Sequence, residues 1–192
     1  MRKLLILALA AVVSLPAPVL RAAEPTVELR IKAIKDLLPL AEYLGDLAGQ
    51  GEQAEQGAKF VEAMAGKKGV IEGIDITKPI GFYATMTPAV IDSPMVVLVP
   101  VGDEKAFLNL LTGKLNLMPD KGEDDIYSIN VPGVPPKVYF KFHKGYVGVT
   151  VHNKAALEGN AILDPKEFFA KPESAILALS VHLDRIPMEV RK

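Results

Sequence analysis

Near both ends of the chain, apolar and polar residues alternate with a period of two, which is typical of β-strands that have one face in water. In the stretch 26–34, the apolar side is Val27, Leu29, Ile31 and Ala33, and the polar side is Glu28, Arg30 and Lys32. In the stretch 174–183, the apolar side is Leu177, Leu179, Val181 and Leu183. We expect both apolar sides to lie on the core and both polar sides to be solvated.

The stretch 137–153 predicts a β-hairpin around a two-residue turn at Lys144-Gly145. This turn pairs His143 with Tyr146 and collects six apolar side chains on one face: Val138, Phe140, Phe142, Val147, Val149 and Val151. The other face carries Tyr139, Lys141, His143, Tyr146, Thr150 and His152, and we expect it to be wet. A possible surface contact for a polyanion or a sugar is formed there by Tyr139, Lys141, Tyr146 and Lys137, although ordinary solvated sheet faces carry the same residue types.

Between these strands the period becomes helical. After Asp36, a predicted cap, apolar residues form one stripe: Leu37, Leu40, Ala41, Leu44, Leu47 and Ala48. A second helix over 52–66 is expected to end at Gly66, and Asp103 is expected to cap a third over 104–113. Further strands are expected at roughly 79–86, 94–101 and 125–131, and short helices at about 154–159 and 166–170. This order predicts an α+β domain over 24–174, with a mainly antiparallel sheet and helices packed on one face.

The first 23 residues have the pattern of a secretory signal peptide: Arg2 and Lys3, an apolar run that is too short to span a bilayer, and small residues at Ala22 and Ala23. An uncleaved anchor is the alternative. Cleavage removes three basic residues and no acid, so the formal net charge of −1 becomes −4. We therefore expect a mildly acidic domain exported to the periplasm or the exterior. Nucleic acid is not an expected partner, and no membrane span is expected after cleavage.

The two ends of the chain also resemble each other. Each alternating stretch leads into a proline-containing segment, with Pro39 after the first and Pro187 after the second. Residues 175–192 are therefore read either as the start of a second structural repeat or as the strand that closes the sheet, followed by a frayed helix.

Several longer segments carry a resemblance: GIDITKPIGFYATM, DSPMVVLVPVGDEKAFLNLL, VPPKVYFKFHKGYVGVTVHNKAAL and ILALSVHLDRIP. Together they resemble the N-terminal part of large secreted hypothetical proteins from planctomycete-type bacteria, which carry a domain of unknown function. The resemblance covers nearly all of the mature chain, and none of its motifs is catalytic. It implies an exported location and a related second half in such proteins, and it implies no activity.

Candidate chemistry is sparse. The chain has no cysteine, which excludes disulfides, thiolate zinc sites and cysteine nucleophiles. His143 and His152 lie about six ladder positions apart, roughly 20 Å, too far to share one ion, and His182 is expected to point to solvent. The acids Asp120, Glu123, Asp124 and Asp125 lack calcium-loop spacing, and Gly49-Gln50-Gly51 follows a helix rather than a strand. No serine lies in a Gly-x-Ser-x-Gly elbow.

These observations predict no catalytic residue, no metal and no cofactor. The expected function is that of an exported non-catalytic module that binds another protein or an envelope component. Two alternatives remain open. The first is a carrier that holds a small apolar ligand between sheet and helices, and the second is a hydrolase with an unrecognised site.

Overall fold

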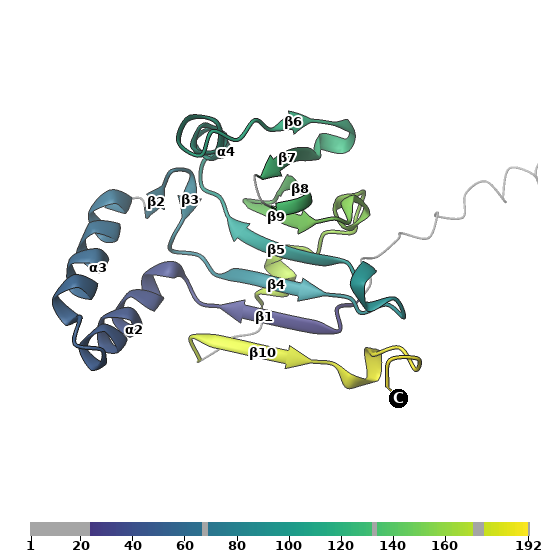
Figure 1. The fold of residues 1–192 in the computed structure, drawn as a ribbon, viewed down its shortest axis with the longest axis horizontal. Coiled ribbons are helices and arrows are strands. Elements are labelled where there is room, and N and C mark those ends of the chain that lie inside the picture. The colour runs from purple at the N-terminus through teal and green to yellow at the C-terminus, as the bar shows by residue number, and fades with distance from the viewer. Residues whose placement is uncertain (1–23, 67–68, 132–133, 171–174, 192) are drawn as a thin grey trace, which may run out of the picture.

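The computed structural model describes residues 24–66, 69–131, 134–170 and 175–191, so the predicted signal peptide lies outside the described residues. In this part of the chain, eight strands form one antiparallel sheet (Figure 1). From edge to edge the order is β10 (Leu177–Val181), β1 (Val27–Ile31), β4 (Ile80–Ala84), β5 (Met95–Pro100), β9 (Tyr146–Val151), β8 (Val134–His143), β7 (Tyr127–Val131) and β6 (Asp120–Lys121). The α+β class with an antiparallel sheet is confirmed.

The helices are α2 (Ile34–Leu47), α3 (Gly51–Ala65), α4 (Glu104–Asn109), which continues as a π-helical turn over Leu110–Lys114, and α5 (Pro165–Phe168). Asp103 caps α4, since its carboxylate accepts a hydrogen bond of 2.9 Å from Ala106 N. Asp36 does not cap α2, because the helix already begins at Ile34 and Asp36 lies in its first turn. A two-stranded ribbon of β2 (Val70–Ile71) and β3 (Ile74–Asp75) follows α3.

The predicted hairpin is confirmed in its register. β8 and β9 pair Val138 with Val151, Phe140 with Val149, Phe142 with Val147 and His143 with Tyr146. Lys144 and Gly145 have φ values of 49° and 77°, the left-handed pair that a type I′ turn requires.

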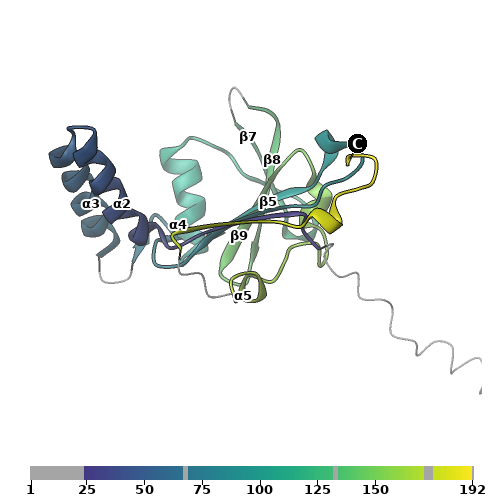
Figure 2. The same cartoon turned by 90° about the horizontal axis from the view of Figure 1, so that it is seen from below.

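The sheet has two faces, which we call face A and face B. Face A carries the row Leu179, Leu29, Phe82, Val97, Val149 and Phe140, and face B carries the neighbouring residues, such as Glu28, Tyr83 and Gly148. Figure 2 shows α4 on one side of the sheet and α5 on the other. Phe107 and Leu111 pack on Phe140 and Val147 of face A.

On face B, α5 and the 3₁₀ turn Lys154–Leu157 pack on the centre of the sheet, where the core residues include Tyr83, Val96, Leu98, Leu157 and Phe168. Two glycines allow this close approach. A Cβ at Gly81 would lie 2.5 Å from Phe168 Cε1, and one at Gly148 would touch Leu157 and Ile162 at 3.4 Å. The core of the domain therefore lies on face B under β4, β5 and β9, and on face A under α4.

The orientation predicted for the two terminal strands is wrong. In β1, Glu28 and Arg30 are 8% and 5% exposed, whereas Val27, Leu29 and Ile31 are only half-buried. In β10, Leu177 and Leu179 are 55% and 63% exposed. The alternation is present as predicted, but the polar side is the covered one, because none of the described helices lies on face A over these strands (Figure 2).

The stripe predicted on α2 also lacks a core. No residue of α2 is buried, and the hairpin of α2 and α3 packs mainly on itself, with Ala58 and Ala65 as its buried residues. Residues 175–191 do not form a separate unit, because β10 pairs with β1 in the main sheet, and a 3₁₀ turn at Leu183–Arg185 stands where a helix start was expected. The internal repeat stays a prediction.

Candidate functional site

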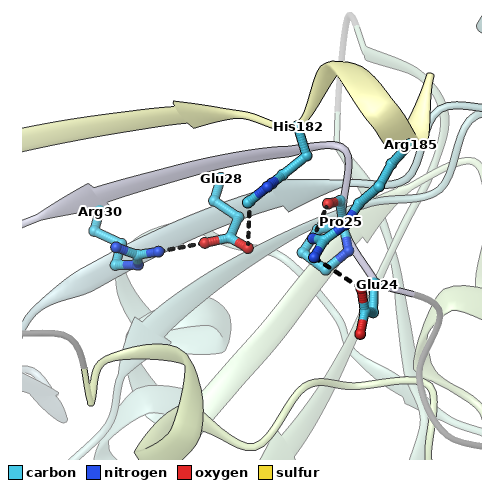
Figure 3. Close-up of polar contacts among 6 residues, drawn as sticks. All are labelled: Glu24, Pro25, Glu28, Arg30, His182 and Arg185. Atoms are coloured by element: carbon cyan, nitrogen blue, oxygen red, sulfur yellow. Dashed lines mark hydrogen bonds and ion pairs between the residues drawn. The ribbon is translucent and has the colours of Figure 1, made fainter.

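The buried polar residues of β1 meet β10 on face B (Figure 3). Arg30 donates a hydrogen bond from Nη2 to Glu28 Oε2, and its guanidinium lies over the Phe168 ring, 5.3 Å from the centroid. On the other side of the same carboxylate, His182 Nε2 lies 3.3 Å from Glu28 Oε1, an ion-pair distance without good hydrogen-bond geometry. Glu28 and Arg30 are two residues apart on one strand and therefore share a face, and the pairing of β1 with β10 brings His182 to them.

A second contact joins the two ends of the described chain. Arg185 donates from Nη1 to the carbonyl oxygen of Pro25 over 2.9 Å, and its Nη2 lies 2.8 Å from Glu24 Oε2 (Figure 3). The guanidinium is thereby held by the segment that leads into β1. This arrangement fixes the turn after β10 against the start of β1.

These side chains border a cleft of about 330 Å³, lined by Glu24, Pro25, Glu28, Arg30, Leu163, Asp164, Glu167, Phe168 and Arg185. The lining holds four carboxylates and two guanidiniums, and none of its side chains carries a hydroxyl or a thiol that could act as a nucleophile. Lys144 bonds to Asp164 and lowers the pKa of that carboxyl. Three of the four carboxylates thus have a cationic partner, as expected of a structural ion-pair network.

Two further depressions lie on face B. One of about 180 Å³ under β4 and β5 is bordered by Tyr83, Val96 and Ala156, and is smaller than the roughly 300 Å³ at which ligand pockets begin. The other, of about 690 Å³, is an open depression over Tyr146 and Phe169 with three lysines on its border: Lys78, Lys144 and Lys166.

The predicted surface contact is only partly at the surface. Tyr146 is 8% exposed and its ring stacks on Phe169, and burial raises the pKa of its phenol to about 12. Tyr139 packs on the face-B core, Lys141 is half-buried and Lys137 is exposed. Tyr146 must therefore be removed from a contact surface, because the loop and helix over 153–170 cover this part of face B.

The three histidines lie apart in the structure. His143 and His152 are at opposite ends of the β8–β9 ladder, and His182 is at the end of β10 and is not fully solvated. Burial lowers the pKa of His143. Across the described ranges, no three His, Asp or Glu side chains are close enough to hold a metal ion. The acids at 120–125 are exposed, and Lys121 bonds to Asp125 at 2.7 Å and lowers its pKa.

One unusual surface is the open part of face A, which we call the bare face. It carries only apolar side chains, three from each of β10, β1 and β4 and two from β5: Leu177, Leu179, Val181, Val27, Leu29, Ile31, Ile80, Phe82, Ala84, Met95 and Val97. Five of them are more than one-third exposed, namely Leu177, Leu179, Val181, Met95 and Val97. A solvated sheet face normally carries polar residues, so a contiguous apolar face of this size indicates an interaction surface.

A second apolar surface lies on the hairpin of α2 and α3. Leu40, Leu44 and Leu47 follow helical spacing along α2, with Tyr43 beside them, and all are at least 40% exposed. On α3, Phe60 and Met64 lie one turn apart and are likewise exposed. Figure 2 shows this hairpin on the same side of the sheet as α4, beyond the strand ends.

Sequence reasoning missed both the ion-pair cluster and the bare face. One signal was present in the chain: Glu28 and Arg30 in one strand and His182 in the other are in the same phase, so antiparallel pairing of those strands brings them together. The sequence does not indicate which face of the sheet the helices cover.

No protein-family model matches the chain, and comparisons with curated proteins and with solved structures found no match. The resemblance to planctomycete-type secreted proteins therefore stays a prediction. Among the helices of the described residues, none is long and apolar enough to cross a membrane.

Proposed function

We propose that this chain is an exported, non-catalytic interaction module that binds a folded protein partner through the bare face. The observation that supports this most strongly is the orientation of β1 and β10, whose apolar side chains are exposed while Glu28 and Arg30 are buried. Exposing leucine and burying an ion pair both oppose folding, so this orientation is advantageous when the apolar side is covered by another protein.

The alternatives receive less support. A carrier needs an enclosed apolar cavity, and the smaller recess on face B is lined in part by polar groups and measures only about 180 Å³. A hydrolase would use the cleft beside Glu28, where no hydroxyl or thiol lines the wall and the carboxylates of Glu28 and Glu24 are paired with Arg30 and Arg185. Location outside the cytoplasm rests on the predicted signal peptide and is part of the proposal.

Site-specific photo-cross-linking in the native host tests the binding surface. A photoreactive residue at Leu179 or Val97, on the bare face, should give covalent protein adducts after irradiation. The matched control is Met118, which is 79% exposed and lies away from the bare face, before β6. Equal labelling at all three positions, or none at Leu179 and Val97, would contradict the proposal.

Export is tested separately by the mass of the protein in the periplasmic or extracellular fraction. The mature chain should begin near Ala23 or Glu24. A soluble cytoplasmic protein that retains Met1 would contradict export without bearing on the binding surface.

A further inference from the structure

The bare face and the exposed stripe of the α2–α3 hairpin are the two halves of a helix-on-sheet layer. In α+β domains, an apolar helix stripe normally packs on an apolar sheet face, and each buries the other. Here the chain contains both, yet neither helix makes an extensive contact with β10, β1, β4 or β5. The bare face has no helix stripe packed on it among the described residues, and the hairpin stripe has no sheet face packed on it.

The connections favour keeping the hairpin off its own sheet. Only Lys32 and Ala33 separate β1 from α2, Ala33 is 3% exposed, and Lys35 N donates a 3.1 Å hydrogen bond to Ile76 O. These contacts hold the first turn of α2 at the end of the strand. The hairpin stands on the face-A side of the sheet (Figure 2), and its stripe residues are exposed, so they are open to contact with a second molecule.

We infer that the partner of the bare face is a second copy of this chain, and that the two copies exchange hairpins, so that α2 and α3 of each copy cover the bare face of the other. This inference rests on the proposed function and names its partner. In a dimer with two-fold symmetry, a contact between the hairpin of one copy and the sheet of the other occurs twice.

The area of the surfaces favours this arrangement over simpler ones. Four strands of five residues, spaced by about 4.8 Å and rising about 3.3 Å per residue, cover roughly 300 Å². Two sheet faces and the two hairpin surfaces that cover them bury roughly 1,200 Å², the lower end of the range of stable interfaces. Direct stacking of two bare faces would bury about half of that, and pairing through the edge of β10 alone would bury less still.

The two surfaces are also compatible in charge. The bare face carries no charged side chain, and the residues of the exposed stripe on α2 are leucines and a tyrosine. The bare face and the stripe on α2 therefore bring no charge of their own into the contact, where an unpaired charge would cost several kcal/mol.

The first test is the mass of the mature chain in solution, measured by light scattering after size exclusion. At about 100 µM, a micromolar interface is nearly saturated, and we expect twice the monomer mass. Leu44→Glu on the hairpin and Leu179→Glu on the sheet should each give monomers with an unchanged circular dichroism spectrum. Met118→Glu, also at an exposed apolar position, should remain dimeric.

Mixing the two monomeric variants tests the exchange itself. A mixed dimer of Leu44→Glu and Leu179→Glu places both substitutions in one of the two contacts and leaves the other contact intact. Dimers should therefore reappear in the mixture, with an affinity below that of the unaltered chain. If Leu44→Glu alone remains dimeric, the copies associate through the sheets without the hairpins, and the inference is overturned.

Cross-linking distinguishes exchange from a hairpin that closes on its own sheet. Because the chain has no cysteine, the variant Leu44→Cys/Leu179→Cys has only these two thiols. A flexible bismaleimide should link them between copies and give a band of dimer mass on a denaturing gel. A linked band of monomer mass, or a monomer at about 100 µM, overturns the inference. The proposed function then stands or falls on the photo-cross-linking, whose adducts would have a mass other than that of two copies.

Discussion

The two halves of the sheet have the same alternation of apolar and polar residues, but the apolar side on face A is covered in only one of them. In β8 and β9, the apolar side lies on face A, where Phe140 and Val147 are at most 2% exposed beneath α4. In β1 and β10, the apolar side also lies on face A, but Leu179 is 63% exposed and the polar side is covered instead. The alternation therefore does not predict which side is buried. The element that packs over β8 and β9, or over β1 and β10, determines which side is shielded from water.

The largest expected effect comes from placing one charge at matched positions in the two halves. Phe140→Asp should lower the free energy of unfolding by at least about 4 kcal/mol, because it removes a buried ring and buries a carboxylate. Leu179→Asp in the same row of face A should change it by less than about 0.5 kcal/mol in the monomer. Urea denaturation at low protein concentration measures both, and equal losses would show that the bare face is covered within one chain.

The next largest effect on stability is expected on the polar side of β1, which lies on face B. Glu28→Ala leaves Arg30 buried without this carboxylate and should lower the free energy of unfolding by about 3 kcal/mol. Replacing Glu28 and Arg30 together by leucine should cost much less, since both buried charges are removed at once. Thermal melts of the single and double variants measure the difference. The exposed pair Glu55 and Lys59 is the control, and Glu55→Ala should have no measurable effect. A Glu28→Ala variant as stable as the unaltered chain would mean that water reaches this cluster.

Comparison with the sequence-based predictions separates local from tertiary information. The hairpin was predicted to the residue because Lys144-Gly145 fixes the turn and the turn fixes the register. Asp103 was predicted as a cap for the same reason, since the interaction spans only three residues. These features depend on neighbours in the chain, and the antiparallel α+β class follows from their order.

The errors concern what covers each surface. Val27 and Glu28 alternate whether the core lies on one side or the other, so period alone cannot orient β1. The stripe on α2 predicts a helix with an apolar side, but not whether its own sheet or another molecule covers that side. The Glu28–Arg30–His182 cluster requires β10 to pair with β1 across about 150 residues of chain, and no local signal specifies that pairing.

A moderate effect is expected where α5 packs closely on face B of β4. Gly81→Ala places a Cβ 2.5 Å from Phe168 Cε1 and 2.8 Å from Phe169 Cζ, both in rings held in the core. We expect a loss of about 1–3 kcal/mol in the free energy of unfolding, from urea melts, because α5 must shift. Gly113→Ala, with nothing within 4 Å of the added Cβ, is the matched control and should be close to neutral. If the two variants have equal stability, α5 is not packed against β4 as described.

The smallest expected effect is seen only at high pH and tests whether the loop and helix over 153–170 keep face B dry. Burial, with a smaller contribution from the charge of Asp75, raises the pKa of Tyr146 from about 10 to about 12, so the folded state holds the phenolic proton more tightly than the unfolded state does. The resulting stabilisation is complete below about pH 10 and is lost as the pH rises towards 12.

Urea midpoints measured between pH 8 and about pH 11.5 should therefore fall less steeply with pH in Tyr146→Phe than in the unaltered chain. Part of the fall should remain, because burial also raises the pKa of Tyr83 to about 12. Tyr43→Phe is the control for loss of a phenol hydroxyl, since that ring is 60% exposed on α2. If the urea midpoints of Tyr146→Phe and Tyr43→Phe change with pH to the same extent, water reaches the Tyr146 phenol. The strands β8 and β9 are then less protected from water on face B than on face A.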